Sequence, residues 1–148
     1  MKKIKVAVIG TGNISNSHIP AYLKNENVEL YALCDINEEV LRKAGERYGI
    51  DRLYTDEAEM LKALPEIDAV SVCTWNSAHA PCTIMALEAG KDVLCEKPMA
   101  LNAKEAQAML DTAKRCGSKL MVGFVRRFGN DTAVMQDFIN GGAVGEIY

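Results

Sequence analysis

The chain has 148 residues, of which 49% are hydrophobic and 25% charged, and its formal net charge is −3. This composition is that of an ordinary globular domain, which excludes a disordered or fibrous protein, and the length suffices for one domain with a sizeable core. The mildly acidic charge argues against nucleic acids or anionic membranes as partners.

The apolar runs are short, and Lys5 interrupts the first of them. A transmembrane segment and a signal peptide are therefore not supported, and we expect a cytoplasmic protein. The five cysteines form no Cys-x-x-Cys pair, and an odd number cannot all pair within one chain. Since there are only two histidines, we expect no metal site and interpret the cysteines as reduced, small hydrophobic side chains.

Short β-branched segments alternate with helical patterns along the chain. The predicted strands are Ile4–Ile9, Val28–Cys34, Leu53–Tyr54, Ala69–Cys73, Asp92–Cys95 and Lys119–Val122. The predicted helices are Asn13–Asn25, Glu38–Tyr48, Asp56–Leu64, Ala78–Ala89, Ala103–Cys116 and Thr132–Asn140. The alternation is typical of βαβ units, so it predicts an α/β fold with a doubly wound parallel sheet.

Residues at the helix ends support these boundaries. Thr55 is predicted to cap the third helix and Asn102 the fifth. Gly90 and Gly117 stand where glycines commonly end helices. Pro20 falls inside the first helix, which we expect to be kinked or split there.

A glycine-rich turn follows the first predicted strand. The segment Gly10–Ser15 matches the dinucleotide fingerprint G-x-G-x-x-G/A, with a serine at the third small position. Gly10 allows the tight turn, and Gly12 lets a pyrophosphate approach the amides at the start of the helix. The residues expected to bind a dinucleotide here are Gly10, Thr11, Gly12, Asn13 and Ile14. The alternative is a glycine turn without a ligand.

Asp35 directly follows the second strand, 20 residues beyond Ser15. A carboxylate at this place accepts hydrogen bonds from ribose hydroxyls and repels the 2′-phosphate of NADP. The next residues, from Ile36 to Glu39, include no cation that could hold that phosphate. We therefore expect Asp35 and Ile36 at the cofactor and predict NAD. Asp35 could also cap the next helix, and the two roles are compatible.

The C-terminal residues have the pattern of an unfinished element. After Gly141-Gly142, the run Val144–Tyr148 resembles the first residues of a further strand, and the chain ends before such a strand could pair. The pattern predicts a domain junction.

Glu96-Lys97-Pro98 follows the fifth strand, and the run Ala86–Pro98 resembles the core motif of the Gfo/Idh/MocA oxidoreductases. The glycine turn, Thr74-Trp75-Asn76 with His79, and Val122–Phe128 occur in the order and spacing of that family. The resemblance implies a Rossmann domain over 1–122 and a junction over 123–148. It also implies that the chain is truncated before a second α+β domain that binds substrate.

The resemblance further implies roles for single residues. Lys97 would be the catalytic residue, beside the nicotinamide and the substrate hydroxyl, and Glu96 would orient it. Without these neighbours, Lys97 would be interpreted as a solvated lysine at a helix entry. Thr74, Trp75 and Asn76 would touch the cofactor, although the family usually carries proline where Trp75 stands. The indole ring either packs along the dinucleotide or anchors its loop.

Two further family positions leave alternatives open. His79 either contacts the cofactor or makes structural hydrogen bonds, and Arg126 either approaches cofactor or substrate or forms a salt bridge at the domain junction. His18 is expected to be structural.

The predicted function is that of the NAD-binding part of a dehydrogenase that transfers a hydride between a secondary alcohol and NAD. The alcohol would be a sugar, cyclitol or polyol, the full-length protein a homo-oligomer, and this chain alone inactive. A stand-alone dinucleotide-binding module with a sensing or regulatory role is the alternative. A methyltransferase that uses S-adenosylmethionine is weaker, because Glu96-Lys97-Pro98 would then have no role.

Overall fold

The structure, a computed structural model, describes residues 2–146. Six parallel strands form one sheet in the order β3-β2-β1-β4-β5-β6. The strands are β1 Ile4–Ile9, β2 Val28–Cys34, β3 Leu53–Tyr54, β4 Ala69–Val72, β5 Asp92–Cys95 and β6 Leu120–Val122. The helices are α1 Ser15–Lys24, α2 Glu38–Tyr48, α3 Glu57–Ala63, α4 Asn76–Glu88, α5 Ala103–Cys116 and α6 Asn130–Asn140, with a 3-10 helix η1 at Val125–Phe128. This strand order is that of the Rossmann fold, which confirms the predicted fold class.

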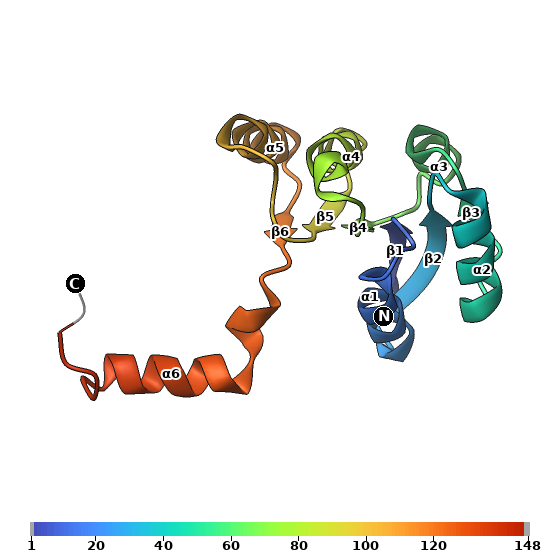
Figure 1. Cartoon of the computed structure of the whole chain (residues 1–148). Helices are drawn as coiled ribbons and strands as arrows, with labels where there is room; N and C mark the ends of the chain where they lie inside the picture. The colour runs from blue at the N-terminus through green and yellow to red at the C-terminus, as the bar shows by residue number, and fades with distance from the viewer. Residues whose placement is uncertain (1, 147–148) are drawn as a thin grey trace.

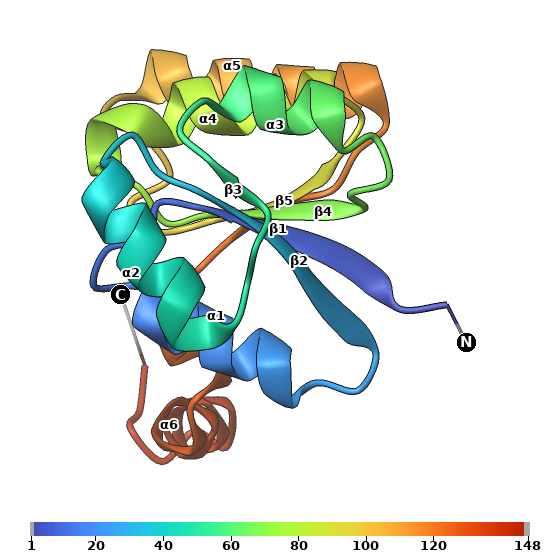
Figure 2. The same ribbon diagram turned by 90° about the vertical axis from the view of Figure 1, so that its right-hand side faces the viewer.

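The helices cover both faces of the sheet: α3, α4 and α5 lie on one face, and α1 and α2 on the other (Figures 1 and 2). Alternate residues of β1 therefore enter two different cores. Ala7 belongs to the same buried cluster as Met60 of α3, and Val8 to the same cluster as Ile19 of α1. Because both faces are buried, the central strands are nearly continuous apolar runs, which is why their positions were predictable.

Most element boundaries agree with the sequence prediction to within two residues. The largest differences are at the starts of three helices, α1, α4 and α6, whose first helical residues are Ser15, Asn76 and Asn130. The predicted split at Pro20 does not occur, because α1 runs from Ser15 to Lys24 without interruption. The side chain of the neighbouring Ile19 is fully buried against the sheet and holds the helix there despite the missing amide donor.

The predicted caps are confirmed except at α3. Asn102 accepts a hydrogen bond from the amide of Glu105, and Gly117 ends α5 in the left-handed conformation. The prediction of Thr55 as a cap is wrong. Asp56 caps α3, and its Oδ1 accepts a 2.8 Å hydrogen bond from the amide of Glu59, because the helix begins one residue later than expected.

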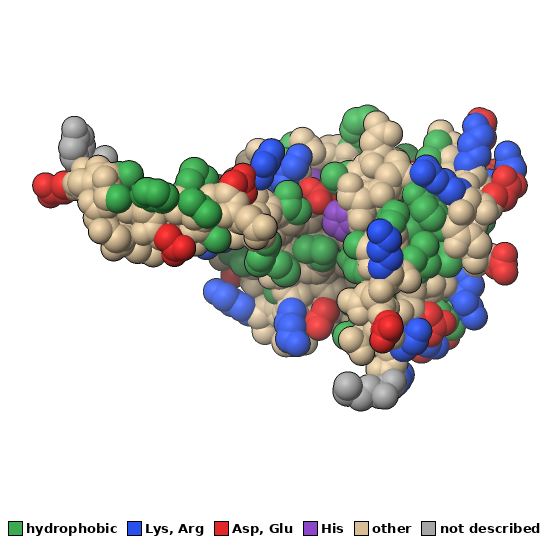
Figure 3. All heavy atoms as spheres, turned by 90° about the horizontal axis from the view of Figure 1, so that it is seen from below, with side chains coloured by type: hydrophobic (Ala, Val, Ile, Leu, Met, Phe, Trp, Pro, Cys, Tyr) green, Lys and Arg blue, Asp and Glu red, His purple; other side chains and the backbone are tan. Residues whose placement is uncertain are grey.

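The C-terminal segment forms an arm that projects away from the sheet (Figure 1). Its elements η1 and α6 carry exposed apolar side chains, which form a band along the arm in Figure 3. Residues 141–146 form turns and irregular backbone. Ile147 and Tyr148 of the predicted further strand lie outside the described residues.

Candidate functional site

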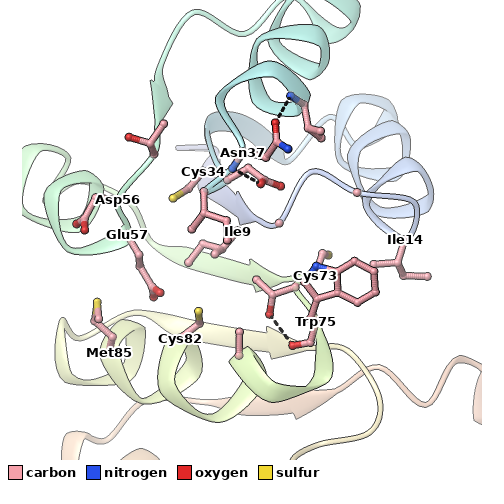
Figure 4. Close-up of a pocket in the computed structure, with 18 of the residues that line it drawn as sticks. Ile9, Ile14, Cys34, Asn37, Asp56, Glu57, Cys73, Trp75, Cys82 and Met85 are labelled. Carbon is pink, nitrogen blue, oxygen red and sulfur yellow. Dashed lines mark hydrogen bonds between the residues drawn. The ribbon is translucent and has the colours of Figure 1, made fainter.

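The carboxyl ends of β1, β2 and β4 meet at the point where the strand order reverses. A crevice opens outside the strands at such a point. A cavity of about 720 Å³ lies there, walled by the turn after β1, the end of β2, the start of α3 and the face of α4 (Figure 4). The arrangement offers one elongated binding site.

The turn after β1 has the geometry of an anion cradle. Gly10 has φ 87°, and a Cβ built there would lie 2.6 Å from the carbonyl carbon of Cys73, so no other residue fits. A Cβ on Gly12 would meet nothing within 4 Å, so this residue leaves room for a ligand to approach the backbone. Among the described residues, no side chain caps α1 and no acid lies in its first turn. The amides at the start of α1 can therefore receive a diphosphate.

Ser15, which replaces the third small residue of the fingerprint, is buried beneath this turn. Its hydroxyl donates a 2.6 Å hydrogen bond to the carbonyl of Gly12. The serine therefore closes the turn from below while its small size preserves the contact between helix and strand.

Asp35 connects β2 to the glycine turn. Its Oδ2 accepts hydrogen bonds from the amide and the hydroxyl of Thr11, at 2.7 and 3.0 Å, and its Oδ1 accepts one from the amide of Asn37 at 2.9 Å. The helix cap of α2 is Asn37 and not Asp35. Three donors leave one acceptor position of the carboxylate for a ribose hydroxyl, and rotation of the Thr11 hydroxyl would free a second.

Two large apolar side chains stand exposed at the mouth of the cavity. Ile36 is 89% exposed and Trp75 is 84% exposed, and both line the cavity. The indole ring of Trp75 points toward Ile14 (Figure 4). An indole this exposed does not anchor its loop by burial, so that alternative for Trp75 is wrong.

His79 lies behind this loop and is 1% exposed. Its Nδ1 is 2.6 Å from the carbonyl oxygen of Pro98, and its Nε2 is 3.2 Å from that of Thr74. The imidazole therefore joins the loop after β4 to the turn after β5. This is the structural role considered for His79 from the sequence.

Glu96 is 4% exposed and lies at the centre of a buried polar chain. Its Oε1 is 2.8 Å from Nε2 of His18, whose Nδ1 is 2.9 Å from the hydroxyl of Ser71. Its Oε2 accepts a 3.1 Å hydrogen bond from the amide of Lys97. The sheet interior thus holds the backbone of Lys97 through Glu96, and His18 has the structural role expected of it.

Residues 4–124 match a family model described as the GFO_IDH_MocA oxidoreductase family with an NAD-binding Rossmann fold. The chain belongs to this family. It is 38% identical over 98% of its length to D-glucoside 3-dehydrogenase of Escherichia coli K12, and 32% identical over 97% to myo-inositol 2-dehydrogenase of Thermotoga maritima. It spans 41% and 42% of these two relatives.

Solved structures of the family have the same fold. Myo-inositol 2-dehydrogenase from Lactobacillus plantarum matches with a TM-score of 0.91 at 28% identity, and the match covers 99% of this chain and 43% of that one. Scyllo-inositol dehydrogenase from Lactobacillus casei, crystallised with NAD(H) and scyllo-inositol, matches with a TM-score of 0.90 at 26% identity over the same shares of the two chains.

The structure brings most of the predicted cofactor residues of the family pattern together. The predicted residues that line the cavity are Gly10, Gly12, Asn13, Ile14, Asp35, Ile36, Thr74 and Trp75, and Thr11 joins them through Asp35. The residues that lie outside the lining are Asn76, His79, Glu96, Lys97 and Arg126. Arg126 is exposed on η1, 3.7 Å from Oδ2 of Asp131. It forms the salt bridge considered from the sequence, though within the arm.

Several lining residues were not predicted, and one of them is an acid with a buried carboxyl oxygen. Glu57 is the first residue of α3, and its Oε1 is buried without a hydrogen-bond partner in the described structure. Burial raises the pKa of this carboxyl to about 7, and the charge of Asp56 raises it further while the Cys82 thiol opposes the shift. The only signal in the sequence was its position after the cap of a short helix.

The cysteines fit the interpretation of reduced, small side chains. All five cysteines are free, and burial raises the pKa of Cys34 and Cys73 to about 12, so both are neutral thiols near pH 7. Residues 2–146 contain no group of three His, Cys, Asp or Glu side chains placed to hold a metal ion. None of the helices in this range is long and apolar enough to cross a membrane.

Proposed function

We propose that this chain is the NAD-binding part of a dehydrogenase that transfers a hydride between NAD and a secondary alcohol of a sugar, cyclitol or polyol. The observation that carries the proposal is the glycine turn, in which Gly12 opens to the cavity opposite Asp35. The relatives named as glucoside and inositol dehydrogenases support the substrate class.

Different residues of the cavity hold different parts of the dinucleotide. The amides of Gly12, Asn13 and Ile14 hold the diphosphate, and Asp35 accepts from the adenosine ribose. A 2′-phosphate would meet the charge of Asp35, so NAD is preferred to NADP. Ile36 and Trp75 flank the cofactor at the mouth of the cavity and shield it from water.

Lys97 is the proposed catalytic residue. It follows β5 at the same edge of the sheet as the cavity. When bound, NAD supplies the acceptor for the hydride that leaves the alcohol carbon. The hydroxyl proton must leave as well, and Lys97 Nζ is proposed to take it, while Glu96 and His18 hold the lysine backbone in place.

The arm supports a two-domain protein. We propose that residues 1–122 form the dinucleotide-binding domain and that 123–148 lead into a second domain, which covers the exposed apolar side chains of η1 and α6. The matched relatives are more than twice as long as this chain. The cytoplasmic location and the homo-oligomeric assembly stay predictions.

A titration tests the cofactor. Trp75 is the one tryptophan of the chain and stands at the cavity, so NAD should change its fluorescence in a saturable way. NADP should require a much higher concentration, and S-adenosylmethionine should have no effect. If only S-adenosylmethionine binds, the dehydrogenase function is wrong.

A second experiment tests the reaction. The full-length protein, assayed with NAD and a panel of inositols, glucosides and linear polyols, should produce NADH with at least one of them. Binding of NAD without turnover of any alcohol would favour the sensing or regulatory module instead.

A further inference from the structure

The cavity extends well beyond the glycine turn, and its far end has a distinct character. Trp75 and Ile14 lie at one end, while Glu57, Cys82 and Met85 lie at the other, between α3 and α4 (Figure 4). Apolar side chains and thiols form the walls there, together with Ala58 and Cys34. A flat, weakly polar group fits such a slot better than a charged one.

Three acids line the cavity, and two of them are already engaged. Asp35 accepts hydrogen bonds from Thr11 and Asn37, and Asp56 caps α3. Glu57 differs, because its Oε1 is buried without a partner in the part of the chain that the structure describes. The Glu57 side chain lines the cavity, so a ligand that enters there can approach the carboxyl.

An ionised carboxyl in this environment destabilises the folded chain unless a ligand donates a hydrogen bond to it. Burial raises the pKa of Glu57 to about 7, which shows how poorly the site solvates its charge. The ionisable neighbours of the carboxyl are Asp56 on its own segment, Cys82 on α4 and Cys34 on β2, and none of them is a cation. A neutral hydrogen-bond donor that enters from the cavity is therefore the partner that suits this carboxyl.

We propose that Glu57 recognises the adenine of the bound dinucleotide, with a carboxyl oxygen accepting a hydrogen bond from the exocyclic 6-amino group. The inference rests on the proposed function, since Asp35 must hold the ribose to which the base is attached. From that ribose the base extends either into solvent or along the cavity, and the slot between α3 and α4 offers apolar walls for its ring faces. Glu57 then determines the choice of nucleobase.

The test compares NAD with an analogue that carries purine in place of adenine and so lacks the 6-amino group. Calorimetric titration of the wild-type chain should show NAD binding about tenfold more tightly, which corresponds to about 1.4 kcal/mol. Glu57→Ala should bind both compounds with nearly equal affinity. Glu57→Gln retains an acceptor oxygen and should retain the preference.

A matched control and a separate readout distinguish the possible failures. Glu59→Gln changes a neighbouring, exposed glutamate of the same helix and should leave the preference unchanged. If wild type binds NAD and the analogue equally, or Glu57→Ala keeps the preference, the adenine contact is wrong while NAD binding stands. If neither compound binds wild type, the proposed function fails instead. Circular dichroism and thermal unfolding verify that each variant is folded.

Discussion

The amide of Thr11 donates a 2.7 Å hydrogen bond to Oδ2 of Asp35, so the glycine turn and the end of β2 are connected directly. The residue proposed to hold the ribose therefore also orients the turn proposed to hold the diphosphate. A single carboxylate therefore connects the two halves of the proposed adenosine diphosphate site.

Replacement of Asp35 should affect affinity and selectivity together. Asp35→Ala removes charge-assisted hydrogen bonds, so NAD should bind about tenfold to a hundredfold more weakly. The affinity for NADP should fall less than that for NAD, or should rise, because the variant lacks the charge that repels the 2′-phosphate. Calorimetry with both cofactors measures the ratio. Thr11→Val keeps the charge of Asp35 and the hydrogen bond from the Thr11 amide, so this control variant should still reject NADP. An unchanged ratio of the NAD and NADP affinities in Asp35→Ala would refute the ribose assignment.

Replacement of Lys97 tests its catalytic role in the full-length protein. Lys97→Met should lower kcat at least about a hundredfold, the usual range for a lost general acid or base, with NAD affinity nearly intact. Steady-state kinetics together with NAD titration separate the two effects. Lys104→Met on the exposed face of α5 serves as the control. A variant that loses only cofactor affinity would make Lys97 a binding residue.

The two glycines of the turn should respond oppositely to alanine. Gly10→Ala places a Cβ against the backbone of Cys73 at a positive φ, so the free energy of unfolding should fall by more than about 2 kcal/mol. Gly12→Ala meets no protein atom within 4 Å, so stability should hold or rise by up to about 1 kcal/mol. NAD affinity should nevertheless fall in Gly12→Ala, because the methyl group would occupy the space proposed for the phosphate. Urea unfolding and calorimetry measure both quantities, and equal destabilisation of the two variants would contradict this geometry.

The pH dependence of the free energy of unfolding should reveal the raised pKa of the Glu57 carboxyl. Its pKa is about 7 in the folded chain against an ordinary value of 4.5, so the folded state binds the proton more tightly. The resulting stabilisation is fully present below the unfolded pKa and is lost as the pH rises through the folded pKa. Relative to Glu57→Gln, the wild-type free energy of unfolding should fall by up to about 3 kcal/mol between about pH 5 and about pH 8. Urea unfolding at several pH values measures this difference, and parallel pH curves for the two proteins would show that the carboxyl is solvated.

Local patterns made the fold and one half of the site predictable. A strand buried on both faces must be apolar, a turn with positive φ requires Gly10, and a carboxylate after the second strand lies close in space to that turn. The misplaced cap at Thr55 shows the limit of such patterns, because two adjacent residues could both cap and only the backbone conformation selects Asp56. Likewise, Pro20 predicted a break in the first helix, but α1 continues through it because the neighbouring Ile19 is buried against the sheet.

By itself, the order of residues determined the strand and helix alternation, the turn proposed to hold the diphosphate and the acid proposed to hold the ribose, since each depends on neighbours close in the chain or on one parallel crossover. Only the tertiary structure decided that His18 meets Glu96 across 78 positions, that the indole of Trp75 stands free, and that Glu57 closes the far end of the cavity. These relationships arise where separate helices pack against one sheet. The side-chain contacts between such helices depend on the packing of the entire domain, which no short pattern encodes.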